Sequence, residues 1–154
     1  MECGGLRILS FSEEDVMNVL DLMRKDYQVD TNRLYLMGHS MGSLIALEFA
    51  ARYPENAEKI ALIGTAYPMK VSDSFLDAAR RNDPSAYDME TIWGHAAQVP
   101  FSANPNPGMW MYGDTLARLA RLAPGVLHAD LAACNAYASG LQSAAQVKCP
   151  ALFV

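Results

Sequence analysis

The feature that most constrains this chain is the run Gly38-His39-Ser40-Met41-Gly42, which lies between an apolar segment and a helical pattern. The apolar segment, Leu34 to Met37, has strand length and no alternation, which is typical of a strand covered on both faces of a parallel sheet. From Ser43 to Tyr53 the apolar residues repeat at helical spacing, and Pro54 ends that pattern. A serine between two glycines at a sharp strand-to-helix turn holds its hydroxyl above the edge of a sheet. The run therefore predicts an α/β fold with one displayed serine.

Two further apolar segments extend the predicted sheet. Ile60 to Gly64 follows the first helix after a polar connection, and Ala151 to Val154 ends the chain. Strand, helix and strand within about thirty residues form a βαβ unit, which crosses over with a right hand. The sequence thus predicts a parallel sheet with flanking helices.

The block between the second and third strands is alanine-rich and predicts helices. Helix starts are indicated at Ser72, at Asp83 with Pro84 behind it, and near Asp114. Turn residues over 100–108 predict a loop. Residues 72–145 are therefore expected to form a helical insertion between two strands of one sheet.

An amphipathic helix is also expected near the beginning of the chain. Ser12 is a suitable N-cap for it, and acids follow at once, where the helix dipole favours them. The apolar stripe expected to be buried comprises Val16, Val19, Leu20, Met23 and Tyr27.

Composition and charge exclude several classes of function. With 12 Lys and Arg against 17 Asp and Glu, the net charge of -5 makes a nucleic-acid partner implausible. No apolar run reaches the roughly 18 to 20 residues of a membrane-spanning helix, and the first residues do not resemble a signal peptide. Cys3, Cys134 and Cys149 are widely spaced, so thiols in a reducing, cytoplasmic environment are expected.

The Gly-x-Ser-x-Gly run predicts its own chemistry. Ser40 would be a nucleophile, and the backbone N–H of Met41, at the start of the helix, would donate to a developing oxyanion. Gly38 and Gly42 are expected because larger side chains at either position would clash with the neighbouring strand and helix. The alternative is an ordinary glycine-flanked turn with an incidental serine.

The segments GHSMGS and ALEFAARYPENAEKIALIGTAYP, with KCPALFV at the end, resemble the α/β-hydrolase superfamily, in particular esterase-like members with a helical cap. The resemblance is best over residues 30–68. It implies a core over residues 1–71, a helical cap over 72–145 and the start of the next core strand over 146–154. The three strands would then be the fifth, sixth and seventh of the family's sheet.

The resemblance also implies where the catalytic residues stand. Ser40 would be the nucleophile and Met41 would supply one oxyanion donor, with Gly38, His39 and Gly42 shaping the turn. The triad acid and histidine of the family follow the strand that begins at Ala151. They are therefore expected beyond Val154, and this chain is expected to be a poorly active fragment by itself.

Other polar residues have simpler interpretations. The side chain of His39 is expected to point into the protein as a packing residue, and His95 and His128 are expected to be cap or surface histidines. Asp73 is expected to be an acid at the N-terminus of a helix, and the alternative is that it is the triad acid. Asp30 is interpreted as a turn residue with Arg33 as its partner.

An apolar group in the helical block could line an acyl pocket or could only pack the cap against the core. Its members are Trp93, Met109, Trp110, Met111 and Tyr112.

The sequence therefore predicts a serine hydrolase that cleaves an ester or similar carbonyl substrate through an acyl-enzyme. Neither a cofactor nor a metal is implied, since the chain has no phosphate loop, no HExxH and no acidic calcium loop. The expected partners are a small to medium hydrophobic substrate and, through open sheet edges, a second copy or a complementary chain. Alternatives are a carbon–carbon hydrolase, a perhydrolase or an acyltransferase on the same fold, and a non-catalytic ligand-binding relative.

Overall fold

The computed structural model describes the backbone of residues 4–31, 33, 35–95 and 111–154, and side chains from Glu14 onward. These residues form two compact units. The first combines Met1–Lys70 with Ala133–Val154, and the second is Val71–Ala132. The helical unit thus ends before residue 145, because the segment after Ala132 is held to the first unit by buried contacts.

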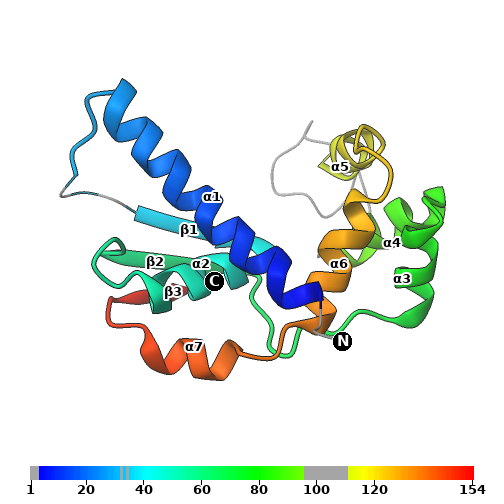
Figure 1. The fold of residues 1–154 in the computed structure, drawn as a ribbon. Helices are drawn as coiled ribbons and strands as arrows, with labels where there is room; N and C mark the ends of the chain where they lie inside the picture. The colour runs from blue at the N-terminus through cyan, green and yellow to red at the C-terminus, as the bar shows by residue number, and fades with distance from the viewer. Residues whose placement is uncertain (1–3, 32, 34, 96–110) are drawn as a thin grey trace. The chain divides into compact units, whose positions relative to one another are not determined.

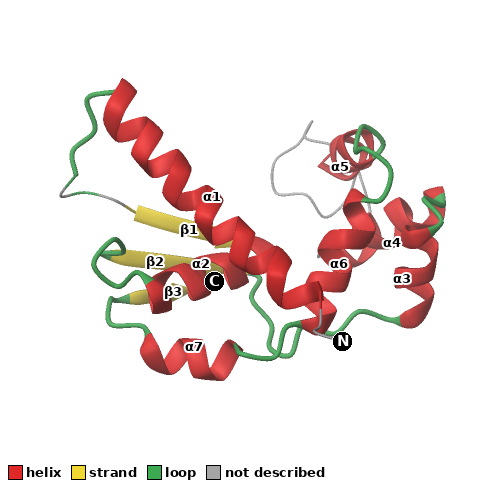
Figure 2. Cartoon of the chain, viewed as in Figure 1, coloured by secondary structure: helices red, strands yellow, loops and turns green. Residues whose placement is uncertain are grey.

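A three-stranded parallel sheet forms the centre of the first unit. Strands β1 (Tyr35–His39), β2 (Lys59–Ile63) and β3 (Ala151–Phe153) lie in the order β1-β2-β3 (Figures 1 and 2). Leu36 pairs with Ile60 and Ile60 with Ala151, so the strands are in parallel register. The predicted α/β class with a parallel sheet is confirmed.

One face of the sheet is covered by α2 (Met41–Arg52). The helix lies between α1 (Gly4–Asp26) and α7 (Gly140–Gln146) and contacts both (Figure 1). Buried apolar side chains of α2 and β2, supplemented by Ala57, make the core of this unit: Ala46, Leu47, Phe49, Ala50, Ala57, Ile60 and Leu62. The continuous apolar character of α2 follows from its central place among these elements.

The other face of the sheet is open in the part of the chain that the structure describes. Met37 and Leu152, which both align with Ala61, are 69% and 61% exposed. Tyr35 on the same face is exposed as well. The expectation that Leu34–Met37 is covered on both faces is therefore wrong for the described residues, because α2 covers only one face.

The second unit contains α3 (Asp73–Arg80), α4 (Pro84–Gly94) and α5 (Met111–Leu119), together with the first part of α6 (Val126–Ala136). Ser72 and Asp83 are the N-caps of α3 and α4, as predicted. Helix α5 already begins at Met111, ahead of the start predicted near Asp114. The loop expected at 100–108 lies outside the described residues.

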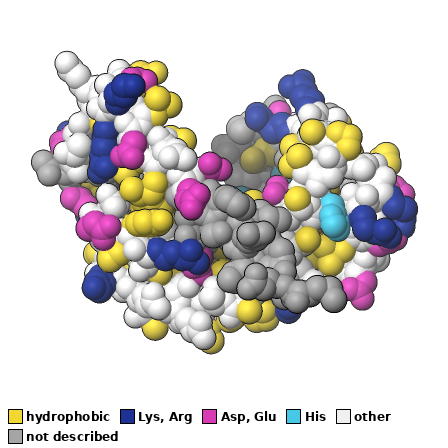
Figure 3. All heavy atoms as spheres, in the orientation of Figure 1, with side chains coloured by type: hydrophobic (Ala, Val, Ile, Leu, Met, Phe, Trp, Pro, Cys, Tyr) yellow, Lys and Arg dark blue, Asp and Glu magenta, His cyan; other side chains and the backbone are white. Residues whose placement is uncertain are grey.

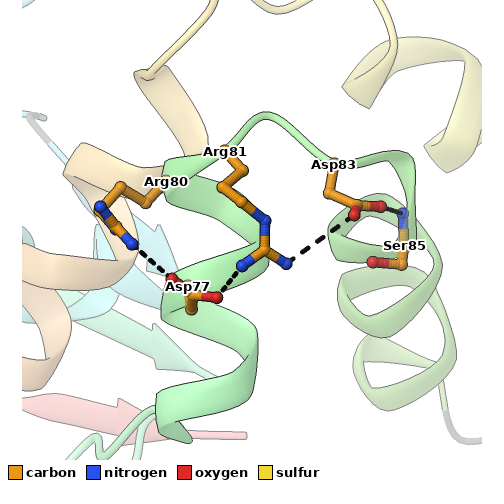
Figure 4. Close-up of polar contacts among 5 residues, drawn as sticks. All are labelled: Asp77, Arg80, Arg81, Asp83 and Ser85. Carbon is orange, nitrogen blue, oxygen red and sulfur yellow. Dashed lines mark hydrogen bonds and ion pairs between the residues drawn. The ribbon is translucent and has the colours of Figure 1, made fainter.

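The turn between α3 and α4 is bordered by a short chain of polar contacts (Figure 4). The Asp77 carboxylate pairs with Arg80 at 2.6 Å and also with Arg81, which reaches Asp83 at 3.9 Å. The carboxylate of Asp83 accepts the backbone N–H of Ser85 at 2.9 Å. This bond holds the pKa of Asp83 below its ordinary value. The ion pairs themselves are exposed and contribute little to stability.

Helix α1 differs from its prediction in extent and in burial. It begins at Gly4, well before Ser12, and only part of its stripe is covered. Within the stripe, Val16 packs against the core and Leu20 is half-buried, whereas Val19, Met23 and Tyr27 are exposed. Figure 3 shows hydrophobic side chains among charged ones at this surface. Among the helices that the structure describes, none has the length and apolar character needed to cross a membrane.

Candidate functional site

Ser40 lies at the junction of β1 and α2, where the chain turns sharply. Its φ of 53° and ψ of −122° place a residue with a side chain in a region that favours glycine. The Ser40 N–H donates to the carbonyl oxygen of Ile63 at 2.9 Å, which fixes the turn to the end of β2. The Ser40 carbonyl in turn accepts the N–H of Ser43 at 2.9 Å. Ser40 is thus held in a strained backbone conformation at the carboxyl edge of the sheet.

The two glycines around Ser40 are not equivalent. A Cβ at Gly38 would overlap the carbonyl group of Gly42, so only glycine fits there. A Cβ at Gly42 would meet no other described atom within 4 Å. The expected clash is therefore present at Gly38, and its prediction at Gly42 is wrong for the described chain, because Gly42 already lies within the first turn of α2.

Met41 is the first residue of α2. N–H groups in the first turn of a helix have no acceptor within that helix and carry the positive end of its dipole. The Met41 N–H therefore has the chemical character of an anion donor, at the residue that directly follows Ser40.

The carboxyl end of β2 borders the Ser40 turn. Gly64 has a φ of 61°, and its N–H donates to the carbonyl oxygen of Val154 at 2.9 Å. The ring of His39 lies beside Gly64 and is exposed, so the expectation of an inward-pointing packing residue is wrong. Thr65 follows, and its hydroxyl oxygen is buried without a hydrogen-bond partner among the described residues. Nothing in the sequence pattern marked Thr65.

The remaining histidines belong to the second unit. Nδ1 of His95 lies 2.7 Å from the carbonyl oxygen of Thr91, at the end of α4, and Nε2 lies 3.4 Å from the Thr115 hydroxyl. His128 is half-buried on α6. His95 is thus the C-cap residue of α4 and half-buried, a position that was not predicted from the sequence.

The two acids considered in the sequence occupy structural positions. Asp73 is the first residue of α3, where the helix dipole stabilises a negatively charged carboxylate. Asp30 accepts from Nε of Arg33 at 2.7 Å in the turn before β1, as predicted.

The candidate pocket residues that the structure describes also lie in the second unit. Trp93 is 60% exposed and packs edge-on against Phe75, with ring centroids 5.5 Å apart. The ring of Tyr112 lies beside that of His95, with centroids 6.2 Å apart, and Met111 is exposed. Met109 and Trp110 lie outside the described residues.

Helix α2 carries a buried carboxylate that was not predicted from the sequence. Glu48 is 3% exposed, and its Oε1 accepts the hydroxyls of Tyr137 at 2.6 Å, of Ser139 at 2.9 Å and of Ser143. Oε2 pairs with Arg52 at 3.3 Å. Burial by itself raises the pKa of Glu48, but the three hydroxyls and Arg52 outweigh it, and the pKa lies below its ordinary value. Burial, and then the bond to Glu48, raise the pKa of Tyr137.

The one signal of this cluster in the sequence is a single acid inside the apolar run of α2. Among the described residues, no group of three or more His, Cys, Asp or Glu side chains lies close enough together to hold a metal ion. Cys134 and Cys149 form no disulfide within that part of the chain.

Comparison with known proteins agrees with this architecture. Residues 5–154 match the family model described as serine aminopeptidase, S33. A solved structure, described as that of a thermophilic esterase, superposes with a TM-score of 0.63 at 18% sequence identity. The match covers 92% of this chain and 51% of the esterase, so the chain spans about half the length of that protein. No curated protein sequence matches the chain.

The esterase match supports the fold, and the family model covers nearly the whole chain. The resemblance seen in the GHSMGS segment is thereby confirmed at the level of the family. This chain belongs to the serine aminopeptidase S33 family of the α/β-hydrolase superfamily.

Proposed function

We propose that the protein is a serine hydrolase that cleaves a carboxylic ester or a similar carbonyl compound through an acyl-enzyme at Ser40. The observation that carries this proposal is the strained backbone of Ser40 between β1 and α2. A conformation that disfavours any side chain is retained where the surrounding structure enforces it, and such positions cluster at active sites.

The first half-reaction forms the acyl-enzyme. Oγ of Ser40 attacks the carbonyl carbon while a general base takes the hydroxyl proton, and the Met41 N–H donates to the tetrahedral oxyanion. Collapse of this intermediate breaks the bond to the alcohol or amine, which leaves with the proton. Water then attacks the acyl group, releases the acid and regenerates Ser40. We propose that the general base and its acidic partner come from sequence outside these 154 residues.

The substrate class is proposed from the apolar side chains of the helical unit. Trp93 and Met111 expose large apolar surfaces, which would favour a small to medium hydrophobic acyl group. Tyr112, which follows Met111 in the sequence, supplies a half-buried aromatic ring. The alternative for this group is packing of the cap against the core.

Labelling with a fluorophosphonate tests the proposal, because the reagent forms a covalent bond with an activated serine. The full-length protein encoded by the gene is incubated with the probe, and the labelled site is identified by mass spectrometry. We expect Ser40→Ala to abolish labelling and Ser85→Ala, which alters an exposed serine on α4, to leave it unchanged. Absence of labelling in a folded full-length protein would contradict the proposed function.

A further inference from the structure

Both connections of the helical unit are tied to each other within the first unit. The outgoing connection ends at Lys70, and the returning one begins at Ala133. The Tyr67 hydroxyl donates to the carbonyl oxygen of Ala138 at 2.6 Å. The ammonium of Lys70 donates to the carbonyl oxygen of Asn135 at 2.9 Å. Segments that are far apart in the sequence are thereby held side by side.

Aromatic packing reinforces this tie. The rings of Tyr67 and Tyr137 meet edge-on, with centroids 5.9 Å apart. Gly140 lies directly against the Tyr67 ring, and a Cβ at this position would overlap it. The close approach of ring and backbone therefore requires glycine at 140.

The returning connection is in turn fixed to α2 through Glu48. Three hydroxyls, those of Tyr137, Ser139 and Ser143, converge on one carboxylate oxygen. An ionised carboxylate only accepts hydrogen bonds and offers about four lone-pair sites, so it can satisfy several donors at once, whereas the amide of glutamine offers about two and adds donors of its own. Replacement of Glu48 by an apolar residue would leave these donors buried without an acceptor.

We propose that Glu48 is a positioning residue that, through Tyr137 and Tyr67, clamps both connections of the helical unit to the helix that begins beside Ser40. The bases of both connections, up to Lys70 and from Ala133, then stay with α2. The clamp itself does not rest on the proposed function, whereas any effect of the clamp on substrate binding does.

Hydrogen–deuterium exchange tests the clamp without any need for activity. We expect Glu48→Ala to accelerate amide exchange over 133–147 by about tenfold or more, since it removes several bonds to a charged acceptor. Tyr67→Phe removes only one hydroxyl from a partly exposed ring, and we expect faster exchange over 137–143 with the rest of the unit unchanged.

Two variants keep this test decisive. Tyr53→Phe is the matched control, because the Tyr53 hydroxyl makes no hydrogen bond among the described residues, and we expect unchanged exchange. Ser143→Ala removes one donor and spares the carboxylate, so it replaces Glu48→Ala if that variant does not fold. Unchanged exchange over 133–147 in Tyr67→Phe and in the Glu48 or Ser143 variant would overturn the proposal.

A kinetic readout separates positioning from simple loss of folded protein. With p-nitrophenyl butyrate and the full-length protein, we expect Glu48→Gln and Tyr67→Phe to raise KM several-fold while kcat changes less than twofold. Loss of folded protein would instead lower the apparent kcat and leave KM unchanged, which would contradict positioning. If the wild-type protein neither hydrolyses the ester nor reacts with fluorophosphonate, the proposed function fails, and exchange alone decides the clamp.

Discussion

Gly38 and Gly42 flank Ser40 symmetrically in the sequence but have different surroundings. Gly38→Ala should destabilise the fold by about 2 kcal/mol or more, because the new Cβ would overlap the Gly42 carbonyl. Gly42→Ala, the matched control, should be neutral or stabilising by up to about 1 kcal/mol, since alanine has a higher helix propensity than glycine. Urea denaturation of both variants measures the difference. Equal losses would show that the turn relaxes around either side chain.

The Glu48 carboxylate makes stability depend on pH. Its folded-state pKa lies below the ordinary value of 4.5, so the ionised form stabilises the fold above that value, and the benefit is lost as pH falls through the folded pKa. Glu48→Gln should therefore cost roughly 2 kcal/mol at pH 7 and progressively less below about pH 4.5. Thermal unfolding of both proteins between pH 7 and 3 tests this. A difference that does not change with pH would contradict the assignment.

At the scale of the elements, the start of α4 depends on one side chain. Asp83 accepts the Ser85 N–H and caps the helix, so Asp83→Ala should lower the unfolding midpoint by a few degrees. Asp88→Ala removes a charge from the exposed surface of the same helix without touching the cap and should change the midpoint little. Circular dichroism melting curves compare the two. A larger effect at Asp88 would contradict the capping role.

The same elements show what the sequence can predict. The starts of α3 and α4 were predicted correctly because Ser72 and Asp83 act on backbone groups within the next few residues. The burial of α1 was not, because exposure of Val19 depends on which helices pack beside it. The burial of Glu48 was not predicted either, because it depends on a contact with Tyr137, which is 89 residues away in the chain.

For the candidate site, local patterning predicted the Ser40 turn and the need for glycine at 38. The exposure of His39 and the buried hydroxyl of Thr65 depend on how neighbouring strands end, which periodicity does not report. The roles of Ser40 and Met41 stay predictions, as do the pocket residues, the cap and the cytoplasmic location.

At the scale of the whole molecule, the open face and edges of the sheet favour association. Met37 and Leu152 expose apolar surface beside strand edges with which no further strand of the described residues pairs, and such edges are templates for pairing with another chain. We expect this chain to form larger species as its concentration rises, and Leu152→Lys to reduce them. Leu141→Lys, on α7 and likewise exposed, is the control that should not. Sedimentation velocity over a concentration series gives the answer, and monomer at every concentration would contradict the expectation.

The backbone of Ser40 has a consequence for how inactive variants are chosen. Alanine at this position removes the hydroxyl but keeps the side-chain carbon that makes a φ of 53° unfavourable. Glycine removes both, so Ser40→Gly should unfold at a higher temperature than Ser40→Ala, in spite of the greater freedom of glycine in the unfolded chain. The difference between these two midpoints would measure how much stability the fold gives up to hold a side chain at this turn.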